Sequence, residues 1–428
     1  MSIQRFVTLL PILAVTVVTA AATARAQDWP QWRGPHRDGT TVGLQAPAAW
    51  PETLRQRWRL EVGGGHASPV LAGDTVYVLS REGDEEVARA VALADGQVRW
   101  RRGYPAPYKM SSAATAHGKG PKATPAVAGG RLHTLGISGI LSTFDAATGE
   151  LVWRRAFGDR FKTTSPLYGT AASPVVDGGR LIAHVGGHHD GALIAFDAAT
   201  GEEIWALAGD GPGYASPIVS ELGGRHQVIT QTDGHVVGVD AGDGTLLWKI
   251  PFTTPWDQNV VTPVESGGLL IIAGLEQPTR AYRLVAEDGG VRPEEVWANP
   301  DVTMYMSTPT AIGDRLFGLS PKRSGQLFAL EVATGKLLHT SAGRDGDNAA
   351  LVAADDRLLV LNDRAELMVI DPGADSLAPQ ARYEVSTAAT WAHPLVTDHG
   401  VVIKDATTVT LFAFEAQAAT SADSDGID

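Results

Sequence analysis

The 428-residue chain is 44% apolar, carries a formal net charge of −13 and contains no cysteine. Its length allows one large repeat domain or two or three ordinary domains, and its acidity disfavours nucleic-acid binding because such a chain repels phosphate backbones. The lack of cysteine excludes disulfides, a covalently attached c-type haem and a lipid-modified N-terminal cysteine.

Residues 1–26 are typical of a secretory signal peptide. Arg5 precedes an apolar run from Phe6 to Val18, and Ala24-Arg25-Ala26 has the pattern of a cleavage site. An uncleaved membrane anchor is the competing interpretation, but Pro11 and the many Ala and Thr residues favour cleavage. No other apolar run is long enough to span a bilayer. We therefore expect a periplasmic or secreted protein that is not a lipoprotein and has no transmembrane segment once the signal is removed.

Residues 27–54 form a leader before the repeats described below. Within it, Trp29 to Pro35 reads "WPQWRGP" and contains two Trp and two Pro residues. Such a segment is expected to dock by its aromatic side chains. We predict that it clamps the outside of the folded unit that follows, and a docking peptide for a partner is the alternative.

One recurring marker is a proline that follows Ser, Thr or, in one copy, His and that precedes apolar residues. Proline is tolerated at the first position of a strand and holds the preceding residue extended, so each copy predicts the start of a strand. The copies lie at intervals of about 40 to 56 residues, the spacing of repeat architectures. The prolines are Pro69, Pro125, Pro174, Pro217, Pro263, Pro309 and Pro394, and an eighth copy, Asn348 to Val352, lacks the proline.

A second marker is the stretch "FDAATGELVW" at Phe144 to Trp153, which returns as "FDAATGEEIW" ending at Trp205. It predicts a hairpin, because Asp145 can accept hydrogen bonds from the following backbone and Gly149 supplies a left-handed conformation. Variants of the stretch end at Trp100, Trp248 and Trp297, and degenerate copies end at His339 and Tyr383. We expect the outer-strand tryptophans to be structural and to pack against a neighbouring repeat.

Each repeat also contains a third strand signal, such as Asp74 to Leu79, so a unit is four antiparallel strands. The sequence therefore predicts an all-β, eight-bladed β-propeller over residues 55–415. The last unit, ending at Thr408 to Glu415, lacks its outer strand, and Arg55 to Val62 with Trp58 supplies one. This shared blade closes the ring without a free edge. Residues 416–428 are predicted to be a disordered acidic tail, and the ring is predicted to be a monomer.

The repeat and its shared terminal blade resemble the PQQ-like (pyrroloquinoline-quinone-type) β-propeller repeat family over residues 55 to 415. The segment "DWPQWRGPHRDG", Asp28 to Gly39, is also similar to a leader found in many exported bacterial members. The family contains quinone-dependent alcohol and glucose dehydrogenases and non-enzymatic scaffolds such as the outer-membrane assembly lipoprotein BamB. The resemblance implies the fold, and both functional classes remain open.

Function is expected where the repeats differ, in the loops just before each strand-opening marker, which share one face of the ring, here called the upper face. These loops are rich in aromatic residues, which suit a planar ligand or a peptide, although they could also simply plug the channel. The candidate binding residues are His66, Lys122, Tyr168, Tyr214, Trp256, Asp257, Asn259, Tyr305, Asn348 and Trp391.

Two further features of these loops carry weaker hypotheses. The long loop Arg101 to Lys122 contains three lysines in an acidic protein and could receive an anionic partner. His188, His189 and Asp190 are candidate metal ligands, but adjacent strand residues point to opposite faces, so we expect no metal site there.

A dehydrogenase of this family would need a stacked quinone and a Ca²⁺ ion beside a catalytic Asp. Trp391 or Trp256 could stack, and Asp257, Asn259 and Asn348 carry oxygen atoms of the kind that Ca²⁺ binds. The dehydrogenases that the resemblance suggests are, however, longer and carry adjacent cysteines over the cofactor. We therefore predict a BamB-like scaffold without catalytic residues or cofactor, which binds an envelope protein or a small ligand. A PQQ- and Ca²⁺-dependent dehydrogenase is the alternative.

Overall fold

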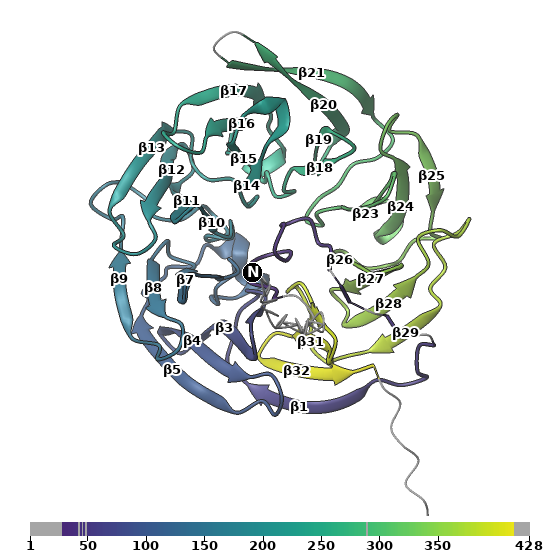
Figure 1. Ribbon diagram of the computed structural model, residues 1–428, viewed down its shortest axis with the longest axis horizontal. Helices are drawn as coiled ribbons and strands as arrows, with labels where there is room; N and C mark the ends of the chain where they lie inside the picture. Colours follow the sequence, from purple (N-terminus) through teal and green to yellow (C-terminus); the bar gives the residue numbers. More distant parts are fainter. Residues whose placement is uncertain (1–27, 42, 45, 48, 288–289, 415–428) are drawn as a thin grey trace, which may run out of the picture.

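The computed structural model describes residues 28–41, 43–44, 46–47, 49–287 and 290–414. It is a ring of eight four-stranded antiparallel sheets around a central channel (Figure 1), which confirms the predicted eight-bladed propeller. In the described part of the chain no helix is long and apolar enough to cross a membrane. The predicted signal peptide and nearly all of the region after the last strand, including the predicted tail, lie outside the described residues.

Within a blade, the strands follow one another outward from the channel (Figure 1). The innermost strands are β2 (Val70–Ala72), β6 (Ala126–Ala128), β10 (Val175–Asp177), β14 (Ile218–Ser220), β18 (Val264–Ser266), β22 (Thr310–Ile312), β26 (Ala349–Ala354) and β30 (Leu395–Thr397). The second strands are β3 (Thr75–Glu82), β7 (Arg131–Leu135), β11 (Arg180–Gly187), β15 (Gln227–Gln231), β19 (Leu269–Gly274), β23 (Arg315–Ser320), β27 (Arg357–Asn362) and β31 (Gly400–Lys404).

The third strands are β4 (Glu85–Ala92), β8 (Leu141–Asp145), β12 (Asp190–Asp197), β16 (His235–Asp240), β20 (Gln277–Glu287), β24 (Gln326–Glu331), β28 (Glu366–Ile370) and β32 (Thr408–Ala413). The outer strands are β5 (Val98–Pro105), β9 (Leu151–Arg155), β13 (Glu203–Gly209), β17 (Leu246–Pro251), β21 (Gly290–Asn299), β25 (Leu337–Thr340), β29 (Ala381–Glu384) and β1 (Arg55–Glu61). The connections contain short 3-10 helices, η1 (Ser112–His117), η2 (Leu222–Gly224), η3 (Pro255–Asp257) and η4 (Lys322–Ser324). Blades are numbered from β2 onward.

The ring closes in blade 8, where the first and last strands of the chain pair. Strand β1 runs antiparallel to β32, with Trp58 opposite Leu411, and the sheet order is β1-β32-β31-β30. The predicted sharing of one blade between two distant segments is therefore confirmed. A closed ring leaves no sheet edge exposed at the join, where another chain could pair.

The tryptophans of the repeated hairpin lie between blades. The Trp153 indole donates to the carbonyl oxygen of Ala198 in the next blade at 3.1 Å. A Cβ atom on Gly201, in the turn after Ala198, would lie only 2.5 Å from that ring. The glycine of the motif is therefore required both by its positive φ of 73° and by the ring packed on it. Equivalent pairs are Trp58 with Gly96, Trp100 with Gly149, Trp205 with Gly244 and Trp297 with Gly335.

Trp248 departs from this pattern in its hydrogen bond. Its indole donates to Gln227 Oε1 of its own blade at 2.7 Å, while the ring still packs with Leu270 and Leu284 of blade 5. The corresponding hairpin of blade 5 differs from those of the other blades, since its strands β20 and β21 are 11 and 10 residues long.

The leader lies inside the central channel, not on the outside of the ring as the sequence suggested (Figure 1). Trp29 exchanges two backbone hydrogen bonds with Leu71 of β2, and Thr41 N–H donates to Ala353 O of β26. The reason is that most innermost strands are only three residues long and are paired on one side, so their other edge needs hydrogen-bond partners. The leader supplies backbone partners to three of these strands, β2, β6 and β26.

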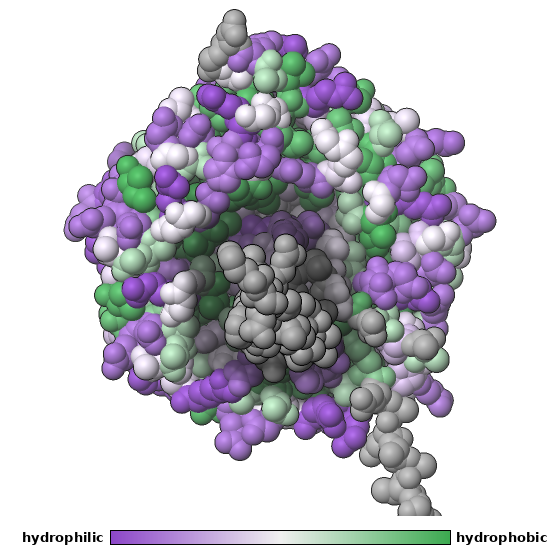
Figure 2. Space-filling model, viewed as in Figure 1, coloured by the Kyte–Doolittle hydropathy of each residue, from purple (hydrophilic) through white to green (hydrophobic). Residues whose placement is uncertain are grey.

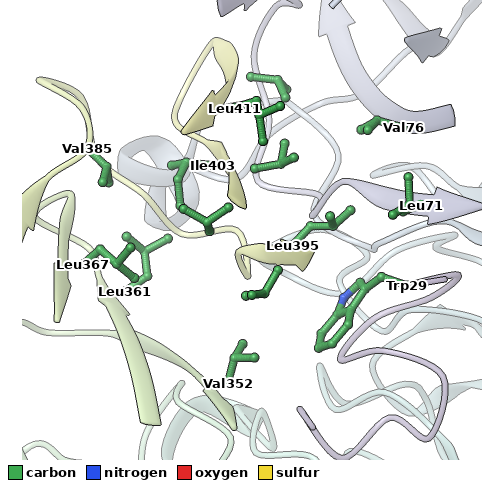
Figure 3. Close-up of a cluster of buried hydrophobic side chains, with 14 of the residues drawn as sticks. Trp29, Leu71, Val76, Val352, Leu361, Leu367, Val385, Leu395, Ile403 and Leu411 are labelled. Carbon is green, nitrogen blue, oxygen red and sulfur yellow. The ribbon is translucent and has the colours of Figure 1, made fainter. Parts of the chain in front are cut away.

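The leader also contributes to the hydrophobic core. Trp29 packs in one cluster with Leu71 and Leu395, so the leader and the innermost strands of blades 1 and 8 share a core (Figure 3). On the face shown in Figure 2, hydrophilic side chains dominate the outer rim, and hydrophobic ones gather in the wall of the central hollow.

Candidate functional site

A cavity of about 190 Å³ lies in the channel where the connections between blades meet. Each of the eight connections that run from an outer strand to the next innermost strand places a side chain in its wall. These side chains belong to His66, Lys122, Tyr168, Tyr214, Gln258, Tyr305, Asn348 and Trp391. All but Gln258 are among the residues singled out from the sequence. Trp32 of the leader also lines the cavity, and its ring centroid is 5.3 Å from that of His393.

Three of the residues singled out from the sequence do not line the cavity. Trp256 is 76% exposed beside it, together with Asp257. Asn259 is fully buried, and its amide donates to the carbonyl oxygens of Thr232 at 2.7 Å and Phe252 at 3.0 Å, so it holds the loop in shape. Gln258 faces the cavity instead, and its side-chain oxygen accepts a hydrogen bond from the Tyr305 hydroxyl. An irregular loop has no period, so no sequence pattern indicates which of the neighbouring side chains points inward.

The residues before the strand-opening prolines form a ring of hydroxyl groups that we call the hydroxyl belt. Its members are Ser68, Thr124, Ser173, Ser216, Thr262 and Thr308, and all of them line the cavity. The backbone N–H of each of the first five donates to the hydroxyl oxygen of the next, at 2.9 to 3.2 Å, and His393 N–H donates to Ser68 Oγ at 2.8 Å. The belt therefore links seven successive blades.

From the sequence, this marker is explained by the conformation of proline alone, and the Ser or Thr before it receives no role. The hydrogen-bond role of the hydroxyl becomes visible once neighbouring blades are placed side by side. In blade 7, where the proline is missing, the arrangement changes: Ala349 N–H donates to Ser307 Oγ, which in turn donates to Asn348 Oδ1.

Burial controls the charge of the cavity. Burial lowers the pKa of Lys122 to about 8, so its ammonium group is largely protonated at neutral pH, and it donates to the carbonyl oxygen of Tyr168. Burial, with help from the nearby Lys404 and Lys122, lowers the pKa of His66 to about 4. Burial likewise lowers the pKa of His117, and that of His393 to about 3. None of the described lining residues is Asp or Glu. Lys122 is therefore the charged group of the cavity at neutral pH.

Aromatic rings supply much of the remaining wall. The Tyr168 and Tyr214 rings pack edge to face with centroids 5.9 Å apart, and the Tyr214 hydroxyl accepts the N–H of Tyr168 at 3.2 Å. The Trp391 ring packs edge to face on His117 at 5.0 Å. These contacts fix the rings before any ligand binds.

The His188, His189 and Asp190 group does not converge on one point. His188 Nε2 lies 3.2 Å from the Tyr214 hydroxyl, and His189 Nδ1 lies 3.2 Å from Asp233 Oδ2. Asp190 instead accepts the backbone N–H of Lys162 at 2.8 Å. Across the described ranges, no group of three or more His, Cys, Asp or Glu side chains is placed to hold a metal ion.

The side chains that line the cavity do not supply the ligands that a quinone with Ca²⁺ would need. Ca²⁺ takes six to eight oxygen ligands, with carboxylates prominent among them. The described lining offers no carboxylate, and the side-chain oxygen of Asn348 already accepts a hydrogen bond from Ser307. Asp257, the nearby acid, is 43% exposed and lies 3.8 Å from His189 Nε2.

A family model described as "Outer membrane protein assembly factor BamB" matches residues 83–341. BamB of Shewanella oneidensis is 26% identical over 235 residues, 51% of this chain and 56% of its own length. The chain thus spans little more than half of that relative. Quinoprotein glucose dehydrogenase of Escherichia coli is 24% identical over 127 residues, 26% of this chain and 16% of its own length.

Among solved structures, the crystal structure of BamB from Moraxella catarrhalis has a TM-score of 0.58 and 18% identity, over 84% of this chain and all of that one. This likeness supports the fold. The family model covers more than half of the chain, and the chain therefore belongs to the PQQ-like repeat family of the outer membrane protein assembly factor BamB.

Proposed function

We propose that this protein is an exported, non-enzymatic scaffold of the cell envelope that binds a partner protein through its upper-face loops. Trp256 is the observation that carries the proposal. It lies on η3, in the same connection as the cavity residue Gln258, is 76% exposed, and has a φ of 64°, with Asp257 following at 52°. Strained backbone persists where the surroundings enforce it, and a large exposed aromatic side chain is the residue type most enriched at binding hot spots.

The setting of Trp256 supports this role. The buried Asn259 amide anchors the same loop, and Gln258 bonds to Tyr305 of the next connection, so the exposed indole stands on a fixed base. Preorganised contacts cost less entropy on binding. The non-enzymatic part of the proposal is supported by the lack of a carboxylate in the described lining, because such a group would serve as a general base or Ca²⁺ ligand.

Replacing Trp256 with alanine is expected to weaken partner binding by roughly thirty-fold, or about 2 kcal/mol, the lower limit for a hot spot. The measurement is quantitative capture of partners from envelope extract by wild-type and variant protein. Ile204→Ala is the matched control, because Ile204 is also exposed, at 47%, but lies on the outer strand β13. If Trp256→Ala and Ile204→Ala capture partner proteins equally well, the result counts against the proposed scaffold function. So would saturable binding of the quinone with Ca²⁺ that leads to dye-linked oxidation of alcohols or sugars.

If the protein is exported as proposed, the N-terminus of the mature chain can be predicted. The protein purified from its native host is expected to begin near Gln27, because the Ala24-Arg25-Ala26 site lies just before it. Mass spectrometry of the intact protein and fractionation of the cells measure this. A full-length chain in the membrane fraction would support the uncleaved anchor instead.

A further inference from the structure

The hydroxyl belt has hydrogen-bond donors to spare. A Ser or Thr hydroxyl has one donor hydrogen and can accept two bonds. Each of the six hydroxyls accepts one backbone N–H, yet none donates to another described residue. The six residues are between 1% and 3% exposed. Six O–H groups, already held in position by the backbone, are therefore available to a molecule in the cavity.

The two side-chain amide oxygens of the same wall are already occupied. The side-chain oxygen of Gln258 accepts from Tyr305, and that of Asn348 accepts from Ser307. Lys122 has three N–H donors, of which the carbonyl oxygen of Tyr168 takes one. With no Asp or Glu in the described lining, no carboxylate would repel a bound anion, and Lys122 and the belt hydroxyls would donate to it. The complementary ligand is one that accepts hydrogen bonds and carries negative charge.

Size and shape restrict the ligand further. An apolar cavity of about 150 Å³ can hold a benzene-sized molecule, and this cavity measures about 190 Å³. Tyr168, Tyr305 and Trp391 present aromatic surface, on which a flat ring packs well. Lys122 is the one cation in the described lining, and a single carboxylate balances its charge better than a doubly charged phosphate does. Arg33 and Lys404 lie behind the wall, where each already donates to a backbone carbonyl oxygen.

We infer that the cavity binds a small monocyclic carboxylate, with the carboxylate between Lys122 and the belt hydroxyls of Thr124 and Ser173 and the ring against the aromatic wall. This inference rests on the proposed function, since it names the ligand class of the same upper-face site.

Benzoate is the probe, and isothermal titration calorimetry is the measurement. The full mature chain is expected to bind benzoate saturably at one site. Benzyl alcohol, with the same ring but no charge, is expected to bind at least tenfold more weakly, and inorganic phosphate is expected not to compete.

Lys122→Met is expected to lower benzoate affinity at least tenfold and to remove the preference over benzyl alcohol. Lys109→Met is the matched control, because Lys109 is exposed in the same connection, and it should bind benzoate like the wild type. A thermal melt of each variant shows that it is folded.

The wild-type protein alone provides a second test that needs no variant. Benzoate affinity should be level between pH 6 and 7 and fall as the pH rises above about 8, because Lys122 then loses its proton. His66, which lies near Lys122, has a pKa lowered to about 4 and stays neutral over this range, and burial also lowers the pKa of His117. Burial lowers the pKa of Lys404 to about 8 as well, but its ammonium group donates to the carbonyl oxygens of Gly65 and Asp405 and does not line the cavity. Burial raises the pKa of Tyr214 and Tyr305, so these groups stay neutral as well.

Three results would overturn the inference: no saturable benzoate binding by the wild type, equal affinity in Lys122→Met, or phosphate binding as tight as benzoate. The two proposals fail separately. Loss of benzoate binding with intact, Trp256-dependent partner capture would refute only the ligand class. Benzoate binding without Trp256-dependent capture would refute only the scaffold.

Discussion

Replacing Trp205 with alanine is expected to lower the free energy of unfolding by about 3–5 kcal/mol. The side chain is 6% exposed, and its indole donates to the carbonyl oxygen of Ala241 in the next blade at 3.2 Å. Its ring also packs on Gly244, where a Cβ atom would be only 2.8 Å away. The substitution would open a cavity between blades 3 and 4 and leave a buried carbonyl without its donor. Chemical denaturation followed by circular dichroism measures the change.

Ile204→Ala is the control for this measurement as well. Ile204 precedes Trp205 on β13, but its side chain is 47% exposed, so its loss should change stability by only about 0.5 kcal/mol. If the two variants unfold at the same denaturant concentration, the tryptophan does not hold the blades together.

The propeller could be predicted from the sequence because its signals are local. A proline that starts an inner strand and an Asp-to-Trp hairpin that ends a blade each need only about ten residues, and their repetition counts the blades. The same regularity placed most of the cavity residues, since a position just before the inner strand points to the channel in every blade. Lys122, Tyr214 and Trp391, which each lie three residues before a strand-opening proline, line the cavity for this reason.

The features that sequence reasoning missed depend on contacts between distant segments. The leader lies in the channel because Arg33 donates to Thr308 O, 275 residues away, and because Thr41 bonds to Ala353. Arginine and proline in a short leader do not distinguish the inside of a ring from its outside. The hydroxyl belt did have a signal, since six of the seven residues before the prolines are Ser or Thr. The role of these hydroxyls, which is to accept a backbone N–H from the neighbouring blade, becomes clear only when the distance between the blades is known.

Replacing Arg33 with methionine is expected to destabilise the protein by about 3–5 kcal/mol, because several buried carbonyl oxygens lose a charged hydrogen-bond donor at once. Arg33 is fully buried in the channel, and burial lowers its pKa to about 10, so it stays charged at neutral pH. Its guanidinium donates to the carbonyl oxygens of Thr308 at 3.1 Å and Pro309 at 2.7 Å, and to that of Asp38 at 2.6 Å. Methionine fills similar space but leaves these oxygens unpaired, each at about 1–3 kcal/mol.

Two measurements check this expectation, equilibrium denaturation and limited proteolysis of the leader. Arg102→Met is the matched control, because the exposed guanidinium of Arg102 also donates to a carbonyl oxygen, that of Thr148 at 3.0 Å. Water replaces an exposed partner, so the control should lose less than about 1 kcal/mol. A leader packed on the outside of the ring would make Arg33→Met as mild as Arg102→Met. The channel position instead predicts that only Arg33→Met makes the leader susceptible to protease, because the released segment loses its contacts to blades 6 and 7 together.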